Sequence, residues 1–491
     1  MFGAKGDGVT DDTNAIQKAV NDSTNHVYFN TDKTYLITKA IILKSELLLD
    51  FNGCNIVANT NGDLFVLDKA NGEARQLTIK GSNCGISGKC ANVFHFIGNN
   101  NFNISPSNYA RLITLDSIRV SGGDTINCFV KMDVAVRDVW ITNCSMWCSN
   151  GVVSTGKSVE ILLDNNIMYT SNSSGFSLQI SSNQNSHFYS EGWTIDNCTI
   201  DNGAVEISDI YVIFFTNCYI GSNVTFSSPT TTTHTRDIMI NNCVFRRKLT
   251  FNSSLTGETS FYAMINNCTI NGILRLDHAA HINVSNVNFQ TNVSPDEYLV
   301  AILGSRNLKN IVIKDIRCDN TYNNTFIINN PGGINNIILD TINFYGQGSA
   351  ISLPNATKPY VLCRNICGGA DFPEKNLIFG PISNGTYDVG EIMFQKSFSC
   401  PKGQRGEIRI HFRCTNDSST QRLDFTFPTN MKVPTGTGWS SSYLYTEGNH
   451  NIEYTIPYYC TDAVSGDIIL KNGNGNSITV GYHGWYSITL E

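Results

Sequence analysis

The chain has 491 residues, a length that predicts several domains or a repeat array rather than one hydrophobic core. Charged residues make up only 15% and glycines number 40, a composition typical of strands and turns. The net charge of −7 argues against nucleic acid as a partner, and no apolar run reaches the ~18 residues of a membrane span. We therefore expect neither nucleic-acid binding nor membrane insertion.

The first predicted element is a short amphipathic helix near the N-terminus. Thr10 or Asp11 can cap a helix in which Ile16, Ala19 and Val20 share one face. Because the open end of a stacked repeat leaves strand edges uncovered, we expect this helix to cap the array that follows.

From about residue 35 a short pattern recurs, in which alternating apolar residues precede an asparagine and often a cysteine, as in Val139–Cys144. The recurring asparagines are Asn143, Asn165, Asn197, Asn217, Asn242, Asn267 and Asn286. A period of roughly 20 to 25 residues with a strand in each repeat predicts a parallel β-helix. A further strand after the turn, as at Ala204–Ile207, indicates at least two strands per turn of the coil.

The asparagine position is interpreted as a structural column. Side chains at one repeat position lie one strand spacing apart, and an amide both donates and accepts hydrogen bonds, so the column can bond to itself inside the stack. The cysteines that follow the asparagines are interpreted as buried free thiols. Neither a metal nor another cofactor is expected.

Beyond Gly368 and Gly369 the repeat ends, and the remaining residues alternate as antiparallel strands. The segment Asn472–Gly475, between Ile468–Leu470 and Ile478–Val480, predicts a β-hairpin. The expected domains are a cap at 1–34, a parallel β-helix with the substrate groove at 35–367, and an antiparallel β-sandwich at 368–491.

The segment Phe2–Thr13, FGAKGDGVTDDT, resembles the opening motif of the pectate-lyase-like β-helix superfamily, which is common in phage tailspikes and capsule depolymerases. The resemblance implies that Asp7, Asp11 and Asp12 are structural rather than catalytic. It also implies a homotrimer whose sandwich supports trimerisation or binds carbohydrate. The expected partner is a bacterial surface polysaccharide, and the expected location is the virion, at the phage tail, or alternatively the secreted fraction.

Candidate catalytic residues follow from the alternation of the repeat. Residues two and four before the asparagine form the core, so those one and three before it face outward. Asp164 and Asp196 occupy the position one before it on neighbouring turns, where about 5 Å of separation suits glycoside chemistry by two carboxylates. The long insertion between them supplies the binding candidates Tyr169, His187, Tyr189 and Glu191.

A second outward column contains Glu206, followed by Asp209 at the next turn. A separation of about 6 to 10 Å between these two acids leaves room for a water molecule. Asp237, Arg275, Asp277 and His278 complete the predicted substrate-binding set. The alternative for all these residues is that they are solvated side chains in polar turns.

The position three before the asparagine forms an apolar outward stripe. It consists of Trp140, Leu162, Thr194, Phe214, Met239 and Met264. Such a stripe is either covered by the chain's own loops or is a subunit interface, as in a homotrimer.

These features favour a tailspike-type depolymerase that binds and hydrolyses a capsule or O-antigen polysaccharide. One alternative is a lyase acting on an acidic glycan, for which Arg275 and His278 are the available groups. Another is an adhesin that binds glycan without cleaving it.

Overall fold

The computed structural model describes residues 2–71, 74–99, 109–181, 190–228, 235–253, 260–290, 298–303, 308–318, 324–329, 334–344, 349–352, 361–367, 376–383, 385–400, 403, 405–415, 419–433, 442–446, 449–462, 464–474, 477–480 and 485–490. The chain divides into two compact units, Met1–Asn283 and Val284–Glu491. The predicted domain limits at residues 34 and 367 remain predictions.

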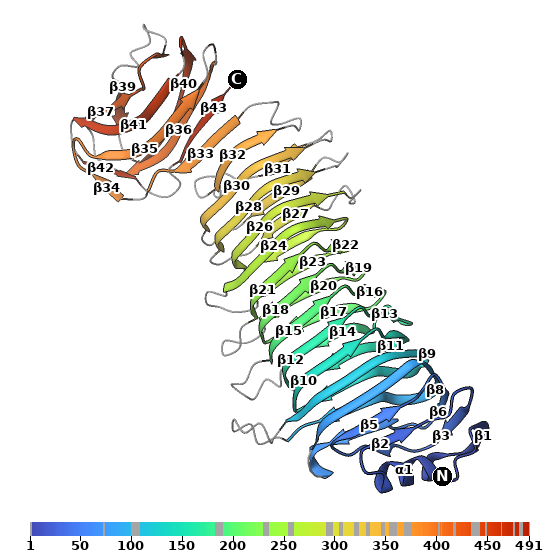
Figure 1. The fold of residues 1–491 in the computed structure, drawn as a ribbon. Helices are drawn as coiled ribbons and strands as arrows, with labels where there is room; N and C mark the ends of the chain where they lie inside the picture. Colours follow the sequence, from blue (N-terminus) through green and yellow to red (C-terminus); the bar gives the residue numbers. More distant parts are fainter. Residues whose placement is uncertain are drawn as a thin grey trace. The chain divides into compact units, whose positions relative to one another are not determined.

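The first unit is a coil of parallel strands in which each turn contributes to three rows (Figure 1). Row 1, before the asparagine turn, contains β2 (His26–Tyr28), β5 (Leu47–Asp50), β10 (Ala135–Thr142), β12 (Lys157–Asp164), β15 (Ser190–Asp196), β18 (Ile210–Thr216) and β21 (Arg236–Asn241). Row 2, after that turn, contains β1 (Asp7–Asp11), β3 (Thr34–Ile37), β6 (Asn55–Asn59), β13 (Ile167–Thr170), β16 (Thr199–Asp201), β19 (Tyr219–Ile220) and β22 (Val244–Phe245). Row 3 contains β4 (Ile41–Ile42), β7 (Phe65–Asp68), β14 (Phe176–Ile180), β17 (Ala204–Ser208), β20 (Val224–Ser228), β23 (Leu249–Ser253) and β25 (Leu274–Asp277).

Several longer strands bend through more than one row. The strands β8 (Arg75–Ile97) and β9 (Ala110–Asp133) pass through all three rows, whereas β11 (Ser145–Ser154) joins rows 2 and 3 and β24 (Ser260–Ile270) joins rows 1 and 2. The strand β26 (Ala280–Phe289) contains the boundary between the units, and a short 3-10 helix occupies Lys69–Asn71. The sequence left the short strands of row 2, such as β16, unassigned.

The helix α1 (Thr13–Asp22) covers the start of the coil with Ile16, Ala19 and Val20 buried, as predicted. Its N-cap residue is Asp12 instead of Thr10 or Asp11, and the Asp12 side chain does not cap the helix. The Asp12 carboxylate instead accepts hydrogen bonds from the backbone N–H groups of Lys5 and Gly6, at 2.7 and 3.0 Å. The carboxylate thus fixes the loop that enters the coil, a structural role.

The asparagines of successive turns form a ladder along the coil. Each has a left-handed backbone, as at Asn165 (φ 52°) and Asn197 (φ 50°). The Asn165 Nδ2 donates to Asn143 Oδ1 at 2.7 Å, and the Asn197 Nδ2 donates to Asn165 Oδ1 at 3.3 Å. The predicted self-bonded column is therefore confirmed, but its side chains are exposed at the corner of the coil, not enclosed. Asparagine suits this corner because its short amide tolerates positive φ.

The cysteines beside the ladder are buried free thiols, as predicted. They include Cys144, Cys198, Cys218, Cys243 and Cys268. Burial raises the pKa of Cys144 to about 12, so this side chain acts as a small apolar core residue. Cys460 in the second unit differs, because it is disulfide-bonded.

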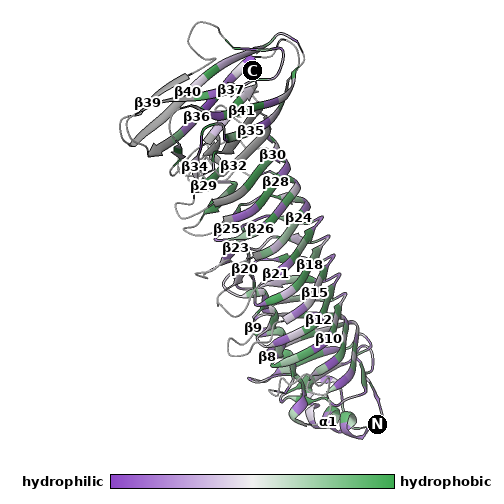
Figure 2. Ribbon diagram, turned by 90° about the vertical axis from the view of Figure 1, so that its left-hand side faces the viewer, coloured by the Kyte–Doolittle hydropathy of each residue, from purple (hydrophilic) through white to green (hydrophobic). Residues whose placement is uncertain are grey.

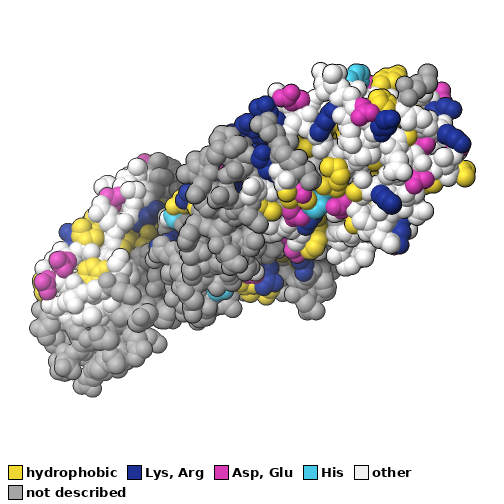
Figure 3. All heavy atoms as spheres, turned by 90° about the horizontal axis from the view of Figure 1, so that it is seen from below, with side chains coloured by type: hydrophobic (Ala, Val, Ile, Leu, Met, Phe, Trp, Pro, Cys, Tyr) yellow, Lys and Arg dark blue, Asp and Glu magenta, His cyan; other side chains and the backbone are white. Residues whose placement is uncertain are grey.

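Apolar and polar residues alternate along the coil strands (Figure 2), since successive side chains of a strand point to opposite faces. The predicted core positions are buried, including Ile141, Leu163, Ile195 and Ile240. Exposed hydrophobic side chains also occur among charged ones on the surface in Figure 3.

The second unit contains further parallel strands and two antiparallel sheets. The parallel strands are β27 (Val300–Leu303), β28 (Leu308–Cys318), β29 (Asn324–Asn329), β30 (Ile334–Phe344), β31 (Ser349–Ser352) and β32 (Val361–Cys367). One antiparallel sheet has seven strands, β33 (Asn376–Pro381), β34 (Gly385–Tyr387), β36 (Arg405–Thr415), β38 (Met431–Lys432), β40 (Asn449–Cys460), β42 (Ile478–Val480) and β43 (Trp485–Leu490). The other has four, β35 (Ile392–Cys400), β37 (Ser419–Thr426), β39 (Ser442–Thr446) and β41 (Val464–Asn474).

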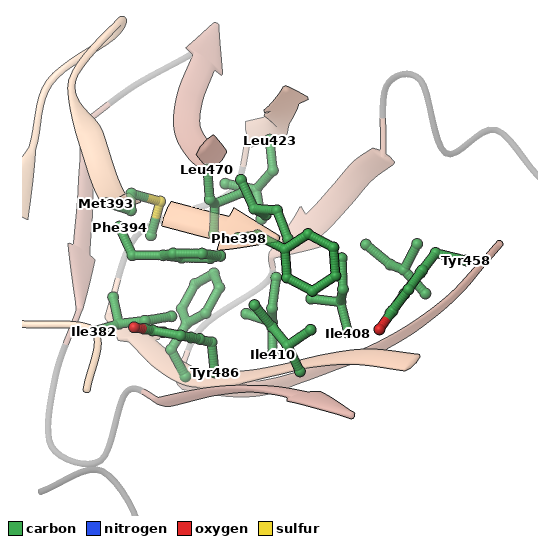
Figure 4. Packing of buried hydrophobic residues seen from close by; sticks show 14 of the residues in the cluster. Ile382, Met393, Phe394, Phe398, Ile408, Ile410, Leu423, Tyr458, Leu470 and Tyr486 are labelled. Carbon is green, nitrogen blue, oxygen red and sulfur yellow. The ribbon is translucent and has the colours of Figure 1, made fainter. Parts of the chain in front are cut away.

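The two antiparallel sheets enclose one apolar core and form the predicted sandwich (Figure 4). At its centre the rings of Phe394 and Tyr486, from opposite sheets, stack with centroids 4.3 Å apart. The predicted hairpin at Asn472–Gly475 is wrong, because β41 and β42 lie in different sheets. The Nδ2 of Asn472, a buried residue, donates to Tyr387 O at 2.9 Å, which fixes the end of β41 away from a hairpin turn. The predicted all-β fold, with its N-terminal helix, parallel β-helix and sandwich, is confirmed.

Candidate functional site

Each row of the first unit has an outward face, and we call these face 1, face 2 and face 3 after rows 1, 2 and 3. The predicted site residues fall on all three. Glu191 and Asp237 lie with the first-row strands, Tyr169 lies on face 2, and Glu206 and Arg275 lie on face 3. His187 and Tyr189 lie outside the described residues. The structure therefore separates the predicted set into distinct surfaces.

On face 1, Asp164 and Asp196 are direct register partners on β12 and β15. Both side chains are half-buried. The Asn217 Nδ2 donates to Asp196 Oδ1 at 3.1 Å, whereas no described residue hydrogen-bonds to the Asp164 carboxylate. The two acids thus stand one strand spacing apart, ~4.8 Å, with one of them oriented by an amide.

A third carboxylate of the same column, Asp116 on β9, has a structural role. Its Oδ1 accepts hydrogen bonds from Thr142 Oγ1 at 3.0 Å and from Asn143 Nδ2 at 2.8 Å. Burial opposes ionisation of Asp116, but these bonds outweigh it and lower its pKa. Asp116 thus accepts a bond from the asparagine ladder, whereas Asp164, in the same column, does not. Substitution of Asp116 can therefore serve as a control for substitution of Asp164.

The apolar stripe also lies on face 1, as predicted from the alternation. Trp140, Leu162, Thr194, Phe214, Met239 and Met264 are in register from strand to strand. Trp140 is 38% exposed, Met239 44% and Met264 50%. Leu162, Thr194 and Phe214 are half-buried, so the exposed apolar side chains of the column lie at Trp140 and at the adjacent Met239 and Met264.

On face 3, the predicted outward column of Glu206, Thr225, Thr250 and Arg275 is in register. Arg275 Nε contacts Asp277 Oδ2 at 2.6 Å, so these two predicted binding residues form an ion pair. Arg275 and Glu206 are exposed, and His278 follows in a left-handed turn (φ 52°).

Asp209 differs from the other predicted catalytic acids because its side chain is 1% exposed. Its backbone N–H donates to Thr235 Oγ1 at 2.8 Å, and its carbonyl accepts from the Ser190 N–H at 3.2 Å. Glu206 and Asp209 therefore do not share the solvent-facing side of face 3.

Face 3 also carries a charged cluster that the sequence did not indicate. His95 Nδ1 lies 2.7 Å from Asp63 Oδ2, and His95 Nε2 lies 2.9 Å from Asp133 Oδ2. Burial alone lowers the pKa of His95, but the bonds to Asp133 and Asp63 outweigh it and raise that pKa. Burial likewise opposes ionisation of Asp133, yet the bonds from His95 and Thr155 lower its pKa to about 2. We call Asp63, His95 and Asp133 together the histidine clasp.

Face 2 contains a hollow of about 350 Å³ that the sequence did not reveal. Its lining includes Arg119, Ser121, Ser145, Trp147, Ile167 and Tyr169. Trp147 and Tyr169 are register partners on β11 and β13 and are 49% and 45% exposed. Tyr169 was predicted to bind substrate, but Trp147 was not, although its buried neighbours Met146 and Cys148 place it outward.

Among the described residues, no helix is long and apolar enough to cross a membrane. Within the same residues, no group of three or more His, Cys, Asp or Glu side chains is placed to hold a metal ion.

The parallel coil with its capped N-terminal end places the chain among parallel β-helix proteins. Residues 1–231 match the family model described as rhamnogalacturonase A/epimerase, pectate lyase-like. The resemblance to pectate-lyase-like β-helix proteins predicted from Phe2–Thr13 is thus confirmed over residues 1–231.

Comparison with individual proteins gave no match among curated sequences. Among solved structures, the surface adhesin PfbA of Streptococcus pneumoniae is 16% identical, with a TM-score of 0.43, over 80% of this chain and 95% of that one. The catalytic unit of a GH87 alpha-1,3-glucanase from Streptomyces thermodiastaticus is 12% identical, with a TM-score of 0.46, over 75% and 68%. The tailspike protein of E. coli bacteriophage HK620 is 10% identical, with a TM-score of 0.39, over 93% and 90%.

Proposed function

We propose that the protein is a tailspike-type depolymerase that binds a bacterial surface polysaccharide, a capsule or O-antigen, and hydrolyses it with Asp164 and Asp196. The observation that supports this proposal most directly is the register that makes these two carboxylates neighbours on β12 and β15. A separation near one strand spacing, about 5 Å, is the geometry of retaining glycoside hydrolysis.

The different surroundings of the two acids suggest their roles. The Asn217 amide orients Asp196, which suits attack on the anomeric carbon to form a glycosyl-enzyme. Asp164 is free of such a bond, which suits the group that protonates the leaving oxygen and then takes a proton from the attacking water. Face 3, with Glu206 and the Arg275–Asp277 pair, supplies polar groups that can bind further sugar units.

The assembly that fits this function is a homotrimer in which copies of the chain cover the apolar stripe of face 1. Its support is the exposure of Trp140, Met239 and Met264, three large apolar side chains in one outward column of the coil. The reaction pair lies in the column beside the stripe, so the groove would lie close to a neighbouring copy. We place the protein at the phage tail, acting on the host surface, or in the secreted fraction.

Substitution of the two acids tests the assignment. We expect Asp164→Asn and Asp196→Asn each to slow cleavage of a susceptible polysaccharide at least about a hundredfold while binding is retained. The matched control is Asp116→Asn, which alters the same column two strands away and should lower stability without removing cleavage. If the Asp164 and Asp196 variants both keep full activity and Glu206→Gln loses it, the catalytic residues lie on face 3 and not on face 1.

A further inference from the structure

The hollow on face 2 lies apart from the proposed reaction pair in the fold, because the asparagine turn separates row 1 from row 2. From its lining we propose that it is a second glycan-binding site, one that takes a sugar unit carrying a carboxylate. The site rests on the proposed polysaccharide function and specifies the class of sugar that the protein retains.

Two aromatic rings form the floor on which a sugar ring can stack. Trp147 and Tyr169 occupy the same position of adjacent strands, about 4.8 Å apart along the coil. Nearly half of each side chain is open to solvent, at 49% and 45%. The π face of an aromatic ring is negatively polarised and can contact the C–H groups of a pyranose. The exposure of both rings leaves these faces accessible to a ligand, unlike the covered rings of the core.

The position of the Trp147 ring is fixed by its neighbours. A Cβ placed on Gly123 would lie 3.7 Å from Cζ2 of Trp147, so the indole packs directly over this glycine. The left-handed backbone of Gly123 (φ 52°) favours glycine at this position. Beside the ring, Ser171 Oγ donates to Asp124 Oδ1 at 2.6 Å, a bond that joins two turns of the coil across the strand that carries Trp147. The platform is therefore held in place before any ligand arrives, which lowers the entropic cost of binding.

The charge of the hollow selects the ligand class. Among the described residues that line the hollow, Arg119 is the one charged side chain, and it is exposed. No described carboxylate forms an ion pair with Arg119, unlike Arg137, which binds Glu160 at 2.7 Å, and Arg275, which binds Asp277. A free guanidinium beside a stacking platform matches a uronate or another acidic sugar, because it binds a carboxylate through two parallel hydrogen bonds.

The register places the three side chains within reach of one sugar unit. Arg119 pairs with Ser145 and Ser145 pairs with Ile167, while Ser121, Trp147 and Tyr169 form the next outward column of the same strands. The guanidinium thus stands at one side of the hollow and the rings at the other. A sugar stacked on the rings can direct its carboxylate toward Arg119 and its hydroxyl groups toward Ser121 and Ser145.

The test measures binding at equilibrium in the Asp164→Asn background, so that cleavage does not consume the probe. The probes are glucuronate-containing oligosaccharides and the same oligosaccharides after reduction of their carboxyl groups. We expect the acidic form to bind about tenfold more tightly than the reduced form, and Arg119→Gln to remove this difference without weakening the reduced form. Trp147→Ala should weaken both forms, whereas Trp147→Phe should preserve most of the affinity.

A change in tryptophan fluorescence on binding that disappears in Trp147→Phe locates the bound probe on face 2. Equal affinity for the two forms, an equal effect of Arg119→Gln on both, or no binding to either form would overturn the proposal. The same probes are assayed for cleavage in the chain with Asp164 intact. Acid-selective binding without hydrolysis would refute the proposed hydrolytic function but support this binding site. Hydrolysis without acid-selective binding would support the proposed function but refute this binding site.

Discussion

Asp164 on β12 and Asp196 on β15 are paired directly in the parallel register, so their carboxylates stand on adjacent turns of the coil. The spacing is set by the strand pairing itself, ~4.8 Å, and not by a flexible loop. A water molecule does not fit between two carboxyl groups at this distance in the way that inversion requires.

This spacing predicts retention of anomeric configuration. Proton NMR of the reducing ends formed in the first minutes of cleavage should show the same anomer as the cleaved linkage, before mutarotation mixes the forms. The same spectrum of the spontaneously equilibrated sugar provides the reference. An initial product of inverted configuration contradicts a reaction by this pair and favours two acids that lie farther apart.

The histidine clasp predicts a stability optimum in mildly acidic solution. Because the pKa of His95 is raised in the folded state, its contribution is complete below the ordinary value of 6.5 and is lost as pH rises through the folded pKa. The pKa of Asp133 is lowered to about 2, so its contribution is present above 3.8 and is lost as pH falls toward 2. Lys131, whose Nζ lies 3.5 Å from Asp133 Oδ1, supports the ionised carboxylate.

Thermal unfolding of the His95→Gln variant between about pH 4 and 9, compared with the unsubstituted chain, measures the contribution of His95 to stability through its titration. The difference in unfolding midpoint between the unsubstituted chain and the variant should be greatest near about pH 5 to 6. It should shrink as pH rises. A difference that is constant across this range would show that His95 stabilises through packing alone.

The asparagine ladder predicts an unequal pair of substitutions at Asn165. Asn165→Ala loses the bonds to Asn143 and from Asn197 and places a Cβ without a compensating side chain at φ 52°, which costs ~1–2 kcal/mol in addition to the lost bonds. Asn165→Gly loses the same two bonds but adopts positive φ freely. Denaturant unfolding should therefore rank the stabilities as asparagine, glycine and then alanine, and an alanine variant at least as stable as the glycine variant argues against backbone strain.

The apolar stripe of face 1 predicts that the protein is oligomeric. Met239 and Met264 are register partners, so Met239→Glu with Met264→Glu introduces two charges at one point of the proposed interface. Mass photometry should give a trimer for the unsubstituted chain and smaller species for the double variant. Met239→Leu with Met264→Leu keeps the stripe apolar and should remain trimeric; a monomeric unsubstituted chain removes the proposed interface.

Most of the coil could be predicted because the alternation of apolar residues and the asparagine recur in successive turns. The alternation around Ile141, Leu163 and Ile195 fixed which residues are buried, and the asparagine spacing fixed which strands pair. Consequently the neighbouring positions of Asp164 and Asp196 follow from the sequence alone. The sandwich was predicted as a class, but its pairing was not, since contacts such as Phe394 with Tyr486 join residues far apart in the chain.

The unpredicted features have separate physical causes. Trp147 lies in the apolar run Met146–Cys148, which shows no two-residue alternation of polarity, so its outward direction was not recognised. The histidine clasp combines residues from three different turns of the coil, Asp63, His95 and Asp133, outside the part where the asparagine repeat is clear. The burial of Asp209 depends on a turn with positive φ, which no hydrophobic pattern encodes.

Analysis of the products formed from purified capsular and O-antigen polysaccharides tests the central claim most directly. Mass spectrometry should find fragments that have each gained one water, with no ultraviolet absorbance from an unsaturated uronate, and Asp164→Asn should abolish them. Unsaturated fragments would contradict hydrolysis and indicate a lyase, for which Arg275 and His278 are the groups to substitute. A polysaccharide that is bound tightly and never cleaved would contradict the enzymatic function altogether and leave an adhesin.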